Sequence, residues 1–117
     1  MNKRTNVEKF LPLKPAAYHI LLSLADGPRH GYAIRASVED LTQGGIRLWP
    51  ATLYGSVRQL YKAGLIEPVA GGGEQDDDAR RRYYRLTALG RRVLVAETER
   101  LRALVEYAQA RRAIAEA

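Results

Sequence analysis

Apolar residues recur at helical spacing along most of this chain, and the first two such stretches predict two short helices. A first helix is expected over residues 15–26, because it opens on a proline, which suits the first helical turn, and stops at a Gly-Pro pair. A second is expected over residues 30–42, where Ile34, Val38 and Leu41 share one face and a Gly-Gly pair follows. Residues 46–48 alternate in a way that predicts a very short strand.

The following stretch predicts a third helix over residues 51–63 and then a β-hairpin. The inward positions of this helix are Leu53, Val57, Leu60 and Tyr61. Gly64 suits the left-handed conformation that ends many helices. Residues 65–70 predict an edge strand, because Pro68 cannot donate to a central ladder, and residues 82–86 alternate as its partner should. Because half of this second strand is exposed, the hairpin is expected to be a wing. The segment between the strands is too glycine-rich and too acidic to bury, so its tip is expected to be flexible.

The C-terminal stretch predicts one long helix from Thr87, a good N-cap, to about residue 112. Its length, about 40 Å at 1.5 Å per residue, exceeds what a small core can cover, so part of it projects. Steps of three and four residues form a coiled-coil seam, which predicts an interface with a partner helix through Leu94, Thr98, Leu101, Leu104, Val105 and Ala108.

The expected fold is mainly α with a small β-hairpin: a winged helix-turn-helix followed by a long dimerisation helix. The expected parts are an N-terminal arm (residues 1–12), a DNA-binding domain (residues 13–86) and the C-terminal helix (residues 87–117). Residues 1–9 are polar and without periodicity, so they are expected to be mobile.

Composition narrows the classes of partner. The 117-residue chain has a formal net charge of +6, which favours a polyanion such as nucleic acid or an acidic membrane surface. Charge alone does not decide, because many soluble proteins are mildly basic. The absence of cysteine excludes disulfides and thiolate metal sites. No apolar run is long enough for a membrane span or a secretory signal, so a cytoplasmic protein without membrane contact is expected.

Three short helices followed by a wing predict that the third helix enters the major groove of DNA. Its outward positions carry small, hydroxyl, amide and cationic groups, which read base edges or hold phosphates: Thr52, Tyr54, Gly55, Ser56, Arg58, Gln59 and Lys62. Arginines at the base of the wing add phosphate contacts: Arg80, Arg81 and Arg82. Two alternatives stay open. The helix residues are an ordinary solvent-facing surface, or the arginines pair with the acidic residues 74 and 76–78 of the hairpin tip.

Other chemistry finds little support in the sequence. Consecutive carboxylates at residues 76–78 cannot all converge on a metal ion, and the glycines at residues 71–73 lack the lysine of a phosphate-binding loop. The two histidines are His19, inside an apolar helix, and His30, at a helix start where it caps the helix or touches a phosphate. No enzyme activity, cofactor or metal is therefore expected.

Three blocks of sequence resemble the PadR family of bacterial transcriptional regulators, in its short form with a single C-terminal helix. They are LLSLADGPRHGYAI (residues 21–34), TLYGSVRQLYKAGLIE (residues 52–67) and RRYYRLTALGRRVL (residues 81–94). The resemblance implies a homodimeric repressor of its own or adjacent genes that binds a palindromic double-stranded DNA operator and is released by a small molecule. It also places His30, Gly31 and Tyr32 at the start of the helix before the reader, so His30 and Tyr32 join the expected DNA contacts.

Some relatives bind flat aromatic compounds, which suggests Tyr18, Trp49, Leu101 and Tyr107 as lining residues of an effector pocket; ordinary packing is the alternative. Trp49 departs from the family pattern, because it precedes Pro50 where a polar helix cap is more usual. A winged helix also serves in some proteins as a protein-interaction module without operator binding, and this stays the alternative function.

Overall fold

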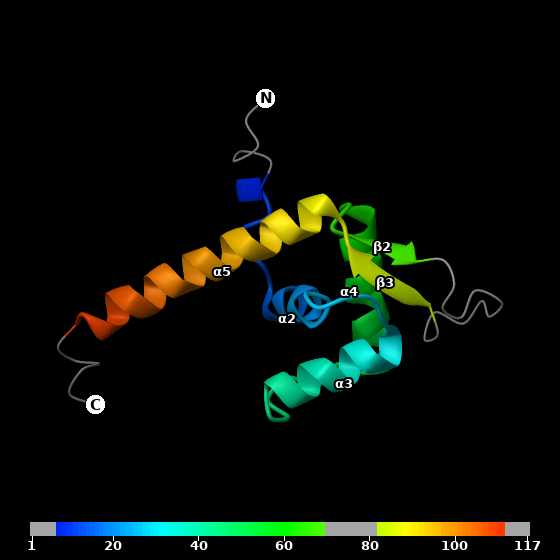
Figure 1. Ribbon diagram of the computed structural model, residues 1–117. Helices are drawn as coiled ribbons and strands as arrows, with labels where there is room; N and C mark the ends of the chain where they lie inside the picture. Colours follow the sequence, from blue (N-terminus) through cyan, green and yellow to red (C-terminus); the bar gives the residue numbers. More distant parts are fainter. Residues whose placement is uncertain (1–6, 70–81, 112–117) are drawn as a thin grey trace.

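The computed structural model describes residues 7–69 and 82–111, which form a mainly helical molecule with a small antiparallel sheet at one end (Figure 1). Its elements in chain order are α2 (Pro15–Ser23), β1 (Arg29–His30), α3 (Gly31–Leu41), α4 (Pro50–Lys62), β2 (Ile66–Val69), β3 (Tyr83–Leu86) and α5 (Ala88–Gln109). In Figure 1, α5 crosses above α2 and extends well past it, while the sheet and α4 lie together at the other end. The predicted winged helix-turn-helix with a long final helix is confirmed.

The sheet has the strand order β1-β3-β2, so β2, which contains Pro68, lies at an edge as predicted. Ile66 pairs with Leu86 and Val69 with Tyr83 across the hairpin. The third strand was missed, because two residues are too few to show alternation and Arg29–His30 becomes a strand only by pairing with β3. The strand expected over residues 46–48 is wrong.

What residues 46–48 form is a loop held by side chains. The Ile46 backbone N–H donates to the Thr42 hydroxyl over 3.0 Å, and the Leu48 side chain is buried in the core. A hydrogen bond to a side chain satisfies the backbone there, so no strand partner is needed.

One hydrophobic core joins all the helices. Its buried side chains include Ile20, Leu21, Leu24, Ile34, Val38, Leu48, Leu53, Val57, Leu60, Leu65, Ile66, Tyr84, Leu86, Val93 and Leu94. Val7 is also buried in it, which corrects the expectation that residues 7–9 belong to a mobile arm; residues 1–6 lie outside the described residues. The first half of α5 therefore shares a core with the helices before it.

Several predicted boundaries and inward positions need correction. The first helix ends at Ser23 rather than Asp26, because the next backbone N–H groups bond three residues back, in tight turns. The last helix ends at Gln109 rather than residue 112. Leu41 and Tyr61, predicted to point inward, are each more than half exposed, because both lie at the rim of their helix's apolar stripe.

Candidate nucleic-acid interface

The outer face of α4 carries most of the residues expected to read DNA. Leu53, Val57 and Leu60 anchor the helix in the core, so the opposite face is turned to solvent. Tyr54 and Ser56 are half-buried at its margin, and the remaining predicted contacts are exposed: Thr52, Gly55, Arg58, Gln59 and Lys62. Because these positions lie on one side of one helix, the structure brings them together as a single polar surface with two cations.

Gly55 lies in the middle of this surface. A Cβ atom added there would meet nothing within 4 Å, so packing inside the chain does not require glycine. Glycine inside a helix costs about 1 kcal/mol relative to alanine. Since no internal contact requires this glycine, its presence is consistent with another molecule approaching the helix backbone closely at this position.

His30 and Tyr32 begin α3 beside the wing. The Ala33 backbone N–H donates to Nδ1 of His30 over 3.1 Å, which confirms the predicted helix cap. The His30 ring packs edge-to-face on Tyr83 of β3, with ring centroids 5.2 Å apart. Tyr32 is 57% exposed and lines a small notch with Arg35 and Tyr54, among other residues of α3 and α4. The start of α3 is therefore joined to both the wing and α4.

Of the three arginines predicted at the base of the wing, one lies within the described residues. Arg82 is exposed directly before β3. Arg80 and Arg81 lie outside the described residues, as do the acidic residues 74 and 76–78 with which the arginines were alternatively expected to pair. Arg85 and Glu67 face each other across the two strands with Nε and Oε2 2.8 Å apart, an exposed pair that contributes little to stability.

The predicted dimer seam divides into two parts along α5. Leu94 is buried in the chain's own core, and the Thr98 hydroxyl is hydrogen-bonded to Tyr18, so both positions are engaged within the subunit. Leu101 and Ala108 are half-buried, whereas Leu104 and Val105 are 53% and 54% exposed. The exposed apolar residues of the predicted seam thus lie in the projecting half of α5.

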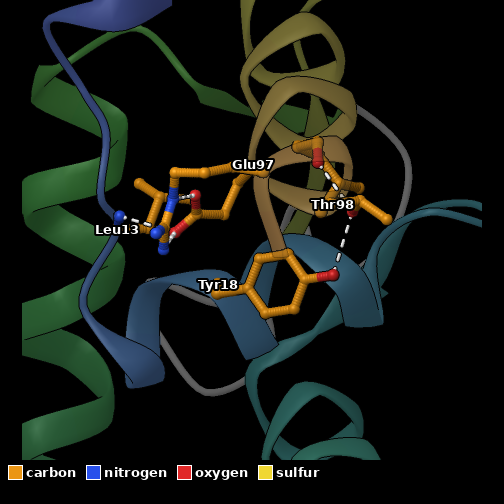
Figure 2. Close-up of polar contacts among 6 residues, drawn as sticks. Leu13, Tyr18, Glu97 and Thr98 are labelled. Atoms are coloured by element: carbon orange, nitrogen blue, oxygen red, sulfur yellow. Dashed lines mark hydrogen bonds and ion pairs between the residues drawn. The ribbon is translucent and has the colours of Figure 1, made fainter. Parts of the chain in front are cut away.

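A polar cluster that sequence reasoning missed attaches α5 to the segment before α2 (Figure 2). The carboxylate of Glu97 is buried, and its Oε2 accepts a 2.9 Å hydrogen bond from the Leu13 backbone N–H. The Arg100 guanidinium lies against the same carboxylate, with Nη2 and Oε2 3.0 Å apart. That hydrogen-bonded arginine, together with the Leu13 N–H, holds the pKa of Glu97 below its ordinary value, although burial acts in the opposite direction.

One residue along, the Tyr18 hydroxyl of α2 is 2.9 Å from the Thr98 hydroxyl (Figure 2). Glu97 and Thr98 thus link α5 to both ends of the chain segment 13–18. A glutamate within a helix pattern gives no sign of burial, because glutamate is usually exposed and the pattern does not show which distant backbone group it meets.

The four residues expected to line an effector pocket lie in three places. Tyr18 and Leu101 belong to the region where α2 meets α5. Trp49 lines a broad depression along α3, and Tyr107 is exposed near the end of α5, where Arg111 stacks on its ring at 3.7 Å. Within one subunit the structure does not bring the four together.

Within residues 7–69 and 82–111, no group of three or more histidine and acidic side chains could hold a metal ion. In the same part of the chain, no helix has the length and apolar character needed to cross a membrane.

Comparison with known proteins gives partial matches by sequence and broader ones by structure. The chain is 46% identical over 50 residues to a 37.1 kDa protein of transposon TN4556 from Streptomyces fradiae; the match covers 43% of this chain but only 14% of that protein. A transcriptional regulator from Clostridium thermocellum has a similar fold, with a TM-score of 0.64 at 22% identity, over 92% of this chain and 93% of the other. Bacillus subtilis PadR, solved in complex with operator DNA, has a TM-score of 0.59 at 22% identity, over 73% of this chain and 46% of that one.

The family model for PadR-like transcriptional regulators matches residues 20–96, which include the end of α2, all elements from β1 to β3 and the buried start of α5. The match covers well over half of the chain and contains the whole face of α4. The chain therefore belongs to the PadR-like family of transcriptional regulators, a family of DNA-binding proteins rather than enzymes.

Proposed function

We propose that this protein is a homodimeric repressor that binds a palindromic DNA operator beside its own or an adjacent gene. The outer face of α4 carries the proposal: the side chains of Thr52, Arg58 and Gln59 are exposed and make no hydrogen bond or ion pair with another described residue. Such groups are free to reach base edges and phosphates in a major groove. Operator DNA bound to the similar Bacillus subtilis PadR supports the same partner here.

The projecting half of α5 supports the dimeric form. Leu104 and Val105 are each more than half exposed on a helix of 22 residues whose buried side chains all lie in its first half. A second copy of the helix would cover this apolar surface. Two subunits related by a two-fold axis would present two copies of α4, which matches the symmetry of a palindrome.

Release by a small aromatic molecule completes the proposal and rests on the family resemblance. Tyr18 and Leu101 lie near the junction of α2 and α5, and Leu101 also belongs to the expected dimer seam. A ligand bound there would alter how α5 is attached to the DNA-binding helices, and thereby the spacing of the two α4 helices.

Fluorescence anisotropy with labelled duplex from the gene's own upstream region tests the DNA-binding function. Binding should be selective over a scrambled duplex of equal length and should weaken steeply with salt. Three described cations a subunit, Arg58, Lys62 and Arg82, give a slope of roughly −5 in log K against log salt for a dimer.

Ser56→Glu tests the role of α4, because it places a carboxylate on the face that would lie against DNA phosphates. Affinity should fall by at least about a hundredfold with the fold intact by circular dichroism. Ala103→Glu makes the same change on the exposed surface of α5, away from α4, and should bind as the parent does. Equal binding of own and scrambled duplex would refute operator specificity in the upstream region, and an unchanged affinity of Ser56→Glu would refute the reading role of α4. An absence of DNA binding at low salt would favour a protein-interaction module.

A further inference from the structure

Trp49, the residue that precedes α4, has no evident role in folding. It is the only tryptophan of the chain, and 62% of its surface is exposed. It occupies the N-cap position, yet its side chain makes no capping hydrogen bond. Serine, aspartate or asparagine at an N-cap bonds the free N–H groups of the first turn, and a side chain without an acceptor does not. The residue thus leaves the start of α4 uncapped and a large apolar ring in water.

The surroundings of Trp49 connect it to the DNA-reading face. Trp49 lines a broad open depression together with Arg35 and Arg47, among other residues of α3 and the segment before α4. Arg35 also lines the small notch formed with Tyr32 and Tyr54. The surface around Trp49 is therefore continuous with the start of α3 and the first turns of α4, where the proposed DNA contacts begin.

The charge of this depression favours an anionic partner. Three arginines line it against two carboxylates, those of Glu39 and Asp40. The Nε of Arg35 is 3.4 Å from Glu39, and the Nε of Arg29 donates to the Ser23 carbonyl over 2.7 Å. Arg47, by contrast, is exposed and has no ion pair with any other described residue. A free cation thus lies two residues before the exposed indole.

We propose that Trp49 and Arg47 contact the sugar-phosphate backbone of the DNA next to the major groove that α4 enters. The indole ring packs on a deoxyribose and its N–H donates to a phosphate oxygen, while the Arg47 guanidinium pairs with a phosphate of the same strand. The inference rests on the proposed DNA-binding function and extends its interface to the segment before α4. It also accounts for an exposed tryptophan where a capping residue would stabilise the helix.

Because the chain has a single tryptophan, its fluorescence reports directly on the surroundings of Trp49. Acrylamide quenching of Trp49 fluorescence is measured with and without a duplex of the gene's upstream region at low salt, with complex formation followed in parallel by anisotropy. The quenching constant should fall severalfold in the complex, because DNA covers the ring. The double variant Trp49→Ser/Tyr107→Trp moves the reporter to a position of equal exposure on α5, and its quenching should not respond to saturating DNA.

Trp49→Ser distinguishes a DNA contact from a structural role. A structural role predicts a lower melting temperature, whereas a DNA contact predicts a lower affinity for DNA with no loss of stability. Serine restores a capping hydroxyl, so the melting temperature of the free protein should rise by about 2 to 6 °C. Affinity for DNA should fall about tenfold, the loss expected for one hydrogen bond to a charged group.

The two levels of the proposal fail in different ways. Unchanged quenching in a complex that anisotropy shows to be formed, or an unchanged affinity of Trp49→Ser, overturns the Trp49 contact and leaves the DNA-binding function standing. An absence of DNA binding in anisotropy overturns both.

Discussion

Gly90 offers a sharp test of how α5 is attached to the rest of the molecule. A Cβ atom added at Gly90 would lie 1.9 Å from the carbonyl oxygen of Leu65 and 2.8 Å from its carbonyl carbon. Ordinary contact begins near 3.4 Å, so the start of α5 and the residue before β2 would have to separate by about 1.5 Å. The clashing atoms belong to the backbone rather than to a flexible side chain, so a change of rotamer cannot relieve the clash.

Two hydrogen bonds depend on this close approach. The Thr87 backbone N–H donates to the Leu65 carbonyl over 3.1 Å, and the Thr87 hydroxyl donates to the Gly64 carbonyl over 2.6 Å. Overpacking typically costs 1–3 kcal/mol, and each weakened hydrogen bond about 1 kcal/mol, against a gain of about 1 kcal/mol from alanine's helix propensity. The net loss for Gly90→Ala is about 2–4 kcal/mol, or a fall of roughly 8–20 °C in melting temperature.

Thermal and urea denaturation at equal protein concentration measure the change, because the stability of the proposed dimer would depend on concentration. Gly55→Ala is the matched control: the glycine is also helical, but nothing lies within 4 Å of its added Cβ. That variant should gain about 1 kcal/mol in the free protein. If Gly90→Ala is as stable as the parent, or more stable, helix propensity outweighs the contact and the packing of α5 on Leu65 is not as described.

Two further predictions concern α5. Because the pKa of Glu97 is lowered in the folded protein, the unfolded chain binds this proton more readily, and the stability contributed by Glu97 is present above about pH 4.5 and lost as the pH falls through the lowered pKa. Glu97→Gln should therefore reduce the loss of unfolding free energy at acidic pH, measured by urea titrations at a series of pH values. An unaltered acid dependence would contradict this role of Glu97. Leu101→Glu with Val105→Glu should yield monomers in analytical ultracentrifugation, whereas Ala103→Glu, on the other side of the helix, should not; a double variant that stays dimeric would place the interface elsewhere.

Local patterns in the sequence were sufficient for the helices, the hairpin and the α4 face. Proline at the first turn of α2, the φ of +81° at Gly64 and the Thr87 cap of α5 all match their predicted roles, because capping and backbone preferences act over a few residues. The α4 face follows for the same reason: a regular helix with one buried stripe fixes what its other side presents.

The tertiary structure decided what depends on contacts between distant residues. Arg29–His30 is a strand only through β3, the buried carboxylate of Glu97 is stabilised by the Leu13 N–H 84 positions earlier, and Gly90 is required by Leu65. None of these has a local signature, since hydrogen-bond partners and close approaches are fixed by the packing of whole elements. The sequence by itself determined a winged helix with a polar, exposed face on α4; the packing decided how α5 is held to it, and left Trp49 exposed at the start of that helix.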